Sequence, residues 1–350
     1  MDTFYTKANL DFKLVTRIGN GGEGEVYKAH DRQLNSVIAI KKVSVKSFIK
    51  ESSYFEEAKK LYLTRHQNIV PVNYACKDDD FIYLAMPLYG NGSLKSQMDT
   101  RFLSSREIIR YSLQFLSGLN NIHTKKLLHF DIKPENILLS NSNQAVISDF
   151  GLAEYTGKYG FSKIHGTTQV LAPPELFSQQ QHNVKFDIYQ AGLTLYRMCV
   201  GDIVFFSQIN EAHIIKGVSH PNNFIFNLMR GNFPDRSFYF SHIPIPLRRV
   251  ITKALNPDIG VRYSTVIEFM NDIASIDNAD DWIFETDYNS FEKWTKPNYE
   301  LICTFANNVW EVVAKKTTTK RTAKKKEFCG SRLNNSGKNA LTYRCLTSTW

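Results

Sequence analysis

The stretch from His129 to Gly151 constrains the fold of this chain more than any other part of the sequence. It reads HFDIKPENILLSNSNQAVISDFG, in which two short apolar runs, Ile137–Leu139 and Ala145–Ile147, flank a polar turn. Two apolar runs around such a turn predict a β-hairpin. The hairpin would bring the polar loop before it and Asp149 after it to the same edge of a small sheet.

The polar residues of this stretch suit phosphoryl transfer. Asp149 and the side-chain oxygen of Asn136 are hard oxygen ligands of the kind that Mg²⁺ prefers. Asp131 is suited to accept a hydroxyl proton, and Lys133 is suited to offset charge on phosphoryl oxygens. Asp, Asn and Pro are also ordinary turn formers. Their combination with Asp-Phe-Gly at this spacing favours the chemical interpretation.

These motifs resemble the catalytic loop and the metal loop of the eukaryotic-type protein kinases. The resemblance implies an α+β, bilobal fold with a small β-rich N-lobe over about 10–86, a hinge over 87–90 and a larger helical C-lobe over 91–276. It implies ATP and Mg²⁺ as cofactors and a protein hydroxyl as acceptor. The Asp-x-Lys-Pro-x-x-Asn pattern, which contains Lys133, is similar to the serine/threonine branch.

Length and composition agree with a catalytic unit that carries an appendage. The 350 residues exceed the roughly 250 to 300 that two lobes need, and 43% hydrophobic with 22% charged residues is ordinary for a globular protein. No apolar run spans a bilayer and the N-terminus lacks a signal-peptide core, so we expect a cytoplasmic protein. Five scattered cysteines without a CxxC pair favour a reducing compartment over disulfides or zinc.

A glycine-rich segment lies near the N-terminus. Residues 12–28 read FKLVTRIGNGGEGEVYK and place Gly19, Gly21 and Gly24 between two β-rich runs. Glycines let a backbone approach phosphates closely. The signal is weak alone, but the strand that follows, with Val26, favours the kinase-type loop over a dinucleotide site. Glu23 is atypical, because an aromatic residue often occupies that place in the family.

Further likenesses imply the rest of a nucleotide site. Val37-Ile38-Ala39-Ile40-Lys41 resembles the third strand of the family, which makes Lys41 the ligand of the α- and β-phosphates. Apolar residues at three- and four-residue intervals over 51–65 (Phe55, Ala58, Leu61 and Tyr62) predict a helix that carries Glu57 as the partner of Lys41. The resemblance also assigns nucleotide contacts to Ala39, Met86 as gatekeeper, Pro87, Tyr89 and Leu138.

The second half of the domain contains structural signals. Ser104 and Glu107 form a capping box before a helix whose buried stripe is Ile108, Ile109, Leu113, Leu116, Leu119 and Ile122. By the resemblance, His129 packs under the Asp-Phe-Gly turn, Asp187 accepts hydrogen bonds from the catalytic loop, and Glu175 pairs with Arg262.

Two features bear on activation and substrate. Phe130 replaces the arginine that normally binds a phosphorylated activation loop, so we expect activity without obligatory phosphorylation there. Counting back from Glu175 favours Thr168 over Thr167 as the residue that contacts Asp131 and Lys133.

Residues 277–350 match no family by eye. Asp280 to Tyr299 are expected to pack on the large lobe, and Tyr299 to Ala314 predict a β-hairpin. Residues 315–326 contain seven lysines and arginines and no acid, which leaves about +2 of the formal charge of +9 elsewhere. This segment is either a solvated disordered tail or a binding site for nucleic acid, acidic protein or anionic membrane.

Three classes of function fit these observations. The leading one is an ATP- and Mg²⁺-dependent serine/threonine protein kinase. The second is a catalytically weak pseudokinase that acts as a scaffold, for which Glu23 and Phe130 leave room. The third is a small-molecule kinase, against which Lys133 and Asp187 argue by their likeness to peptide-positioning residues. Substrate, pathway and oligomeric state do not follow from a kinase fold.

Overall fold

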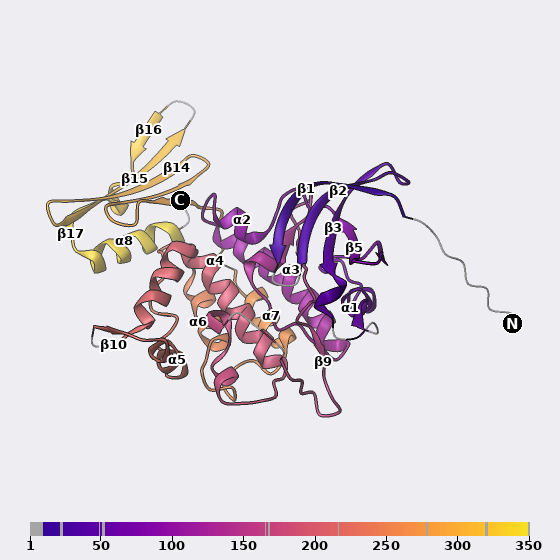
Figure 1. Cartoon of the computed structure of the whole chain (residues 1–350). Coiled ribbons are helices and arrows are strands. Elements are labelled where there is room, and N and C mark those ends of the chain that lie inside the picture. The colour runs from indigo at the N-terminus through magenta and orange to yellow at the C-terminus, as the bar shows by residue number, and fades with distance from the viewer. Residues whose placement is uncertain are drawn as a thin grey trace, which may run out of the picture.

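The computed structural model describes residues 10–21, 24–48, 50, 53–164, 166, 169–215, 217–277, 279–318 and 321–348. The small lobe is an antiparallel five-stranded sheet in the order β1-β2-β3-β5-β4. Its strands are β1 (Phe12–Gly21), β2 (Gly24–Asp31), β3 (Ser36–Ser44), β4 (Tyr74–Lys77) and β5 (Phe81–Pro87). Helix α1 (Glu56–Leu63) lies beside this sheet (Figure 1). Its Leu61 and Ala58 pack into the main core.

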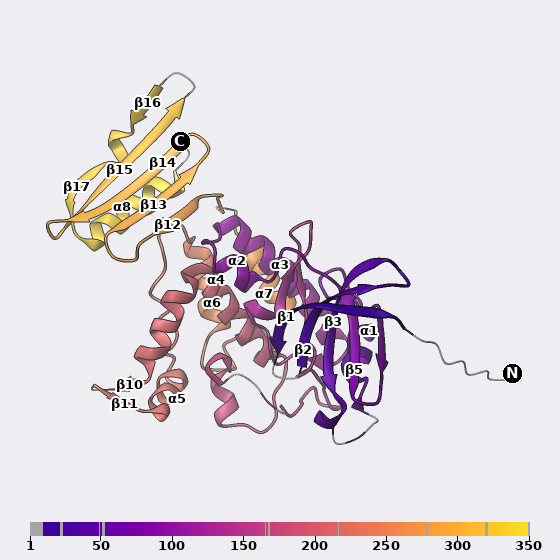
Figure 2. The same ribbon diagram turned by 45° about the horizontal axis from the view of Figure 1, so that its top comes forward.

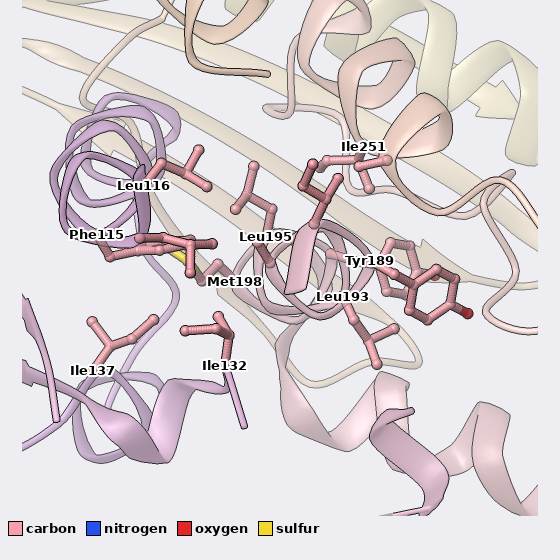
Figure 3. Close-up of a cluster of buried hydrophobic side chains, with 14 of the residues drawn as sticks. Phe115, Leu116, Ile132, Ile137, Tyr189, Leu193, Leu195, Met198 and Ile251 are labelled. Atoms are coloured by element: carbon pink, nitrogen blue, oxygen red, sulfur yellow. The ribbon is translucent and has the colours of Figure 1, made fainter. Parts of the chain in front are cut away.

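The large lobe is built around two buried helices, α3 (Ser105–Thr124) and α4 (Val184–Ala212). Phe115 and Leu116 of α3 meet Leu195 and Met198 of α4 in the core shown in Figure 3. Around them lie α2 (Leu94–Met98), α5 (Pro221–Met229), α6 (Ile245–Ala254) and α7 (Val266–Ala274). The two-stranded sheets are β6 (Leu127–Leu128) with β9 (Glu154–Tyr155), β7 (Ile137–Leu139) with β8 (Ala145–Ile147), and β10 (Ile214–Ile215) with β11 (Val218–Ser219).

Several structural predictions for this lobe are confirmed. Ser104 and Glu107 form the capping box of α3. Arg262 donates to both oxygens of Glu175, at 2.7 and 2.8 Å, in a buried ion pair. The predicted hairpin exists as β7 and β8, whose end residues Ile137 and Ile147 pair directly.

Other details differ from the sequence interpretation. Helix α1 is shorter than residues 51–65, and Tyr62 is 55% exposed because it lies outside the buried face, under the Arg65 guanidinium. On α3, Ile109 and Leu113 are only half-buried, and Tyr111 and Phe115 fill the core instead. Helix α4 continues past Val200 to Ala212 across a kink at Gly201, whose φ of +76° favours glycine.

Residues 280–348 form a compact C-terminal module. Its sheet follows the order β12-β13-β14-β15-β16, and β17 also pairs with β15. The strands are β12 (Ile283–Thr286), β13 (Phe291–Lys296), β14 (Tyr299–Ala306), β15 (Val309–Thr318), β16 (Arg321–Lys324) and β17 (Gly330–Leu333), and helix α8 (Asn335–Thr347) covers one face (Figure 2). The expected hairpin is confirmed as β14 and β15.

The C-terminal module packs on the large lobe, as predicted for its first residues. Ser105 Oγ donates to the Asp280 carbonyl at 3.0 Å, and Arg106 pairs with Asp281 at 3.1 Å. The Trp294 indole donates to His242 Nδ1 at 3.2 Å. Figures 1 and 2 show the module on the side of the large lobe away from α1.

The prediction of a disordered basic tail is wrong for the described residues. Lys315 and Lys316 lie on β15, Lys324 ends β16, and Lys326 begins a short 3₁₀ helix. Backbone pairing between β15 and β16 orders this segment. Lys320 lies outside the described residues. In the described part of the chain, no helix combines the length and apolarity that crossing a membrane requires.

Candidate active site

Lys41, Glu57 and Asp149 meet at the junction of the lobes. The Lys41 ammonium lies 2.9 Å from both Glu57 carboxylate oxygens and 2.8 Å from Asp149 Oδ1. Strand β3 supplies the lysine, α1 the glutamate, and the loop after β8 the aspartate. The predicted pairing of Glu57 with Lys41 is therefore present. A cavity of about 800 Å³ borders this cluster and is lined in part by Gly24, Phe150 and Gly151.

The charges of this cluster stabilise one another. Burial alone would lower the pKa of Lys41, but Glu57 and Asp149 outweigh it and the pKa is raised. For Asp149, burial favours a higher pKa, but the charge and hydrogen bond of Lys41 hold the pKa below its usual range. Both groups are therefore ionised at neutral pH. The cluster presents a fixed cation beside a carboxylate, as a site for a polyphosphate and its metal requires.

Asp131, Lys133 and Asn136 form a second cluster. Lys133 Nζ lies 2.8 Å from Asp131 Oδ2, and Asn136 Nδ2 donates to the same oxygen at 2.7 Å. Asn136 also donates to the Asp131 backbone carbonyl at 2.9 Å. Because both amide hydrogens of Asn136 point to Asp131, its Oδ1 is the atom left for a cation. The Asp131 carboxylate is thereby fixed by two donors.

His129 and Ser148 connect the two clusters. The His129 ring stacks edge-on to Phe150 at 5.0 Å, and its Nε2 lies 3.2 Å from the Ser148 carbonyl. Ser148 N donates to the Asn136 carbonyl at 2.9 Å. Burial holds the pKa of His129 below its usual value, so the ring is neutral. These contacts agree with the packing role that the sequence predicted for His129.

A polar stripe on α4 supports the catalytic loop from beneath. Asp187 accepts from the backbone N–H of His129 at 2.9 Å and of Phe130 at 2.8 Å, as predicted. Sequence reasoning missed the rest of the stripe: Gln190 bonds the backbone of Phe130 and Ile132, Thr194 Oγ1 donates to the Ile132 carbonyl, and Arg197 pairs with Glu135. The sequence already contains a signal for this stripe, because its four polar residues recur at three- and four-residue spacing in the otherwise apolar stretch from Phe186 to Val200.

Phe130 is part of an apolar cluster. Its side chain is fully buried and stacks edge-on to Phe186 at 5.1 Å, and the His182 ring lies 6.3 Å away. Its φ of +65° is unusual for a side chain of this size. Asp187 fixes that backbone by accepting the Phe130 N–H. Phe130 therefore packs in an aromatic cluster at the position where, by the resemblance, an arginine would bind a phosphorylated activation loop.

The predicted nucleotide contacts lie on β1, β2, β3, β5 and β7 and in the segment that follows β5. Ala39 pairs with Met86 across β3 and β5, Val26 pairs with Lys41, and Gly19 pairs with Val26. Leu138 bridges to Ser93, directly after the segment that holds Pro87 and Tyr89. Burial raises the pKa of Tyr89.

Gly24 has a structural reason beyond phosphate approach. A Cβ at this position would lie 2.7 Å from the Lys42 carbonyl oxygen, so no larger residue fits without movement. Gly21 pairs with Gly24 at the end of the hairpin. Glu23, at the tip, and the activation-segment residues Thr167 and Thr168 lie outside the described residues.

The two clusters fit a divalent cation bound together with a nucleotide. Asp149 and Asn136 offer two oxygen donors from adjacent loops, and among the described residues no three acidic, histidine or cysteine side chains group as a metal site. Mg²⁺ in phosphoryl-transfer sites takes one or two protein oxygens and completes its shell with phosphate oxygens and water. The donor set therefore fits a divalent cation that binds together with a nucleotide.

A bilobal fold with these clusters at the lobe junction defines a class of phosphotransferases, and comparisons with known proteins agree. The family model for the protein kinase domain matches residues 12–273. The probable serine/threonine-protein kinase PknB of Lactococcus lactis is 26% identical over 277 residues, covering 77% of this chain and 42% of that protein. Human serine/threonine-protein kinase ULK3 is 31% identical over 210 residues, covering 57% and 44%. Arabidopsis thaliana AtPK1/AtPK6 is 30% identical over 197 residues, covering 55% and 42%.

The chain therefore belongs to the protein kinase family, in its eukaryotic-type serine/threonine branch. It spans less than half the length of the relatives named above. The matched residues end before the C-terminal module.

Proposed function

We propose that this protein transfers the γ-phosphoryl group of ATP to a serine or threonine hydroxyl of a protein, through a catalytic domain over 10–276. The observation that carries the proposal is that Lys133 and Asn136 contact the same oxygen of Asp131. The Lys41–Glu57–Asp149 cluster supplies the second half of the site. Positioning and electrostatics supply most of the catalysis in this reaction, and both clusters are pre-assembled.

Each residue has a role in this proposal. Asp131 orients the acceptor hydroxyl and takes its proton, while Lys133 offsets charge on the transferred phosphoryl group. Lys41, held by Glu57, binds the α- and β-phosphates. Asn136 and Asp149 hold Mg²⁺, which when bound neutralises phosphate charge. Gly19, Gly21, Gly24 and Val26 cover the phosphates, and Ala39, Met86, Pro87, Tyr89 and Leu138 enclose the adenine.

Labelled ATP tests the reaction and separates it from the alternatives. Purified protein with γ-labelled ATP and Mg²⁺ is expected to label itself or a generic basic protein on serine or threonine. Nucleotide binding without transfer under any divalent metal would instead support a scaffold, and label appearing only in small metabolites would indicate a small-molecule kinase.

The basic end of β15 and β16 favours a second function, binding of duplex nucleic acid. Lys315 and Lys324 are direct cross-strand neighbours. Lys315 pairs with Glu300 at 3.0 Å, whereas Lys324 is exposed, so a bound anion would offset the charge that Glu300 leaves. Lys316, Lys325 and Lys326 lie next to them, and the described residues of β16 are exposed and lack aromatic side chains. A two-stranded ribbon of this kind fits the major groove, whereas lipid insertion would require apolar side chains.

Salt dependence tests this second function. Five described lysines can neutralise at most about five phosphates. A plot of the logarithm of the binding constant for duplex DNA against the logarithm of the salt concentration is therefore expected to have a negative slope no steeper than about −4 to −5. Changing all five lysines to glutamine is expected to abolish binding, while Lys46→Gln with Lys125→Gln, both exposed elsewhere, is expected to preserve it. Equal binding by the five-lysine variant, or binding only to vesicles of anionic lipid, would refute the proposal.

A further inference from the structure

Helix α1 contains a buried lysine that the proposed reaction does not use. Lys60 is only 7% exposed, although lysines on surface helices normally face water. It lies three residues after Glu57, so the two side chains share the helix face that packs against the interior. An apolar residue would fill this place at no electrostatic cost, which indicates that the charge has a use.

The Lys60 ammonium is held by the segment that follows Asp149-Phe150-Gly151. Its Nζ donates to the backbone carbonyl of Ala153, a fully buried residue, and lies 3.8 Å from Glu154 Oε1. A buried ammonium is tolerated only where it has such partners, and removing them leaves an uncompensated charge. The position of α1 and the position of residues 153–154 are therefore coupled.

These contacts close a ring through the active site. Lys41 binds Asp149, and the chain from Asp149 reaches Ala153 through a turn in which Ala153 N donates to the Phe150 carbonyl at 3.1 Å. Ala153 binds Lys60, and α1 connects Lys60 to Glu57, which returns to Lys41. Glu154 also pairs with Leu128 across β9 and β6, one residue before His129. The ring thus reaches the start of the catalytic loop.

We propose that Lys60 is a positioning residue, which locks α1 to the segment after Asp149 and so keeps Glu57 on Lys41. This inference rests on the proposed kinase function. The lock consists of an unmodified side chain and a backbone carbonyl, so it needs no phosphate on the activation segment. It gives a physical basis for activity in a chain where Phe130 offers no charge to a phosphorylated loop.

Lys60→Met tests the lock, because methionine keeps most of the side-chain volume and removes the ammonium. We expect kcat to fall about ten- to a hundred-fold, since small misplacements of catalytic groups have effects of this size. Hydrogen exchange is expected to rise in residues 53–64 and 150–156 and nowhere else. Lys60→Arg should retain more activity than Lys60→Met. The matched control is Lys59→Met, at an exposed neighbour that pairs with Glu56, which should change neither quantity.

A double variant separates positioning from general loss of stability. If Lys60 acts through Glu57, adding Lys60→Met to Glu57→Gln should lower kcat by less than twofold further, whereas independent effects would multiply. If Lys60→Met does not fold, as judged by circular dichroism, Lys60→Gln takes its place with the same expectations.

Unchanged exchange in residues 53–64 and 150–156, or a kcat of Lys60→Met within twofold of the wild type, would overturn the inference. If the wild type transfers no phosphate at all, the proposed kinase function fails instead. The exchange comparison then still decides whether the lock exists, so the two failures are distinguishable.

Discussion

The catalytic cleft and the C-terminal module are stabilised in different ways. In the cleft, charged groups such as Lys41, Asp187 and Lys60 are buried, and each needs a partner from another element. The module also buries one such lysine, Lys338, which pairs with Glu292 at 2.7 Å, but most of its buried side chains, such as Trp294, Leu301 and Val312, form an apolar core under α8. Buried ion pairs add little net stability but fix geometry, whereas apolar burial adds stability with little geometric demand. The charged groups of the cleft fix the geometry that chemistry requires, whereas the apolar core of the module mainly stabilises its fold.

The two largest expected effects are losses of stability, and the first comes from breaking a buried ion pair of the large lobe. Arg262→Met removes the partner of Glu175, whose side chain is only 5% exposed. We expect the free energy of unfolding to fall by about 3–5 kcal/mol, because a buried carboxylate is left without a counter-charge. Urea unfolding measures the change. A double variant with Glu175→Leu should recover part of the loss, and a loss below about 1 kcal/mol for the single change would contradict this view of the lobe.

The second prediction concerns the apolar core of the module. Trp294→Ala empties a fully buried site and removes the hydrogen bond to His242, so we expect a loss of about 3–5 kcal/mol in module stability. Phosphoryl transfer at low temperature should be unchanged, because Trp294 belongs to the core of the module and not to the main core. Thr295→Ala, on the other face of the same strand, is the control and should change stability by less than about 0.5 kcal/mol. A parallel loss of activity would show that the two regions are not independent.

The smallest effect is a pH dependence at the contact between the large lobe and the module. Burial lowers the pKa of His242 to about 3, whereas an unfolded histidine titrates near 6.5. Between these values the unfolded state binds the extra proton, so stability falls as pH falls, by at most about 1.4 kcal/mol per pH unit. Below about pH 3 both states are protonated and this dependence ends.

His242→Gln keeps an acceptor for Trp294 and is expected to reduce the stability lost between pH 7 and pH 5 by about 2 kcal/mol. Denaturant unfolding at the two pH values measures it. The buried His129 shifts stability in the same direction in both proteins, so it cancels in the comparison. Equal losses in wild type and variant would show that His242 is accessible to protons in the folded state.

The same two regions differ in how far the sequence predicted them. In the cleft, motif order placed Lys41, Glu57, Asp131 and Asp149, because phosphoryl transfer restricts both residue type and spacing. Of the strands of the module, the sequence predicted only the hairpin over Tyr299 to Ala314, which is β14 and β15. The remaining strands are short, and their pairing depends on long-range burial around Trp294 that no local pattern encodes.

Two misses have a common physical cause. The partners of Lys60 and Arg197 come from distant segments, so their burial appears only when the chain is folded. The order of residues 315–318 and 321–326 was also missed, because backbone pairing between β15 and β16 outweighs the repulsion among lysines. The composition of this segment indicates repulsion among its lysines but does not indicate the pairing of the two strands.

The most direct test of the account is the single-turnover rate of phosphoryl transfer by Asp131→Asn beside the wild type. Asparagine keeps the shape of the side chain but has far less affinity for a proton. We expect ATP to bind both proteins equally and transfer to fall by at least about a hundred-fold, the lower end of what general acid–base groups contribute. Equal rates in the two proteins would contradict the assignment of Asp131 and, with it, the catalytic reading of the cleft.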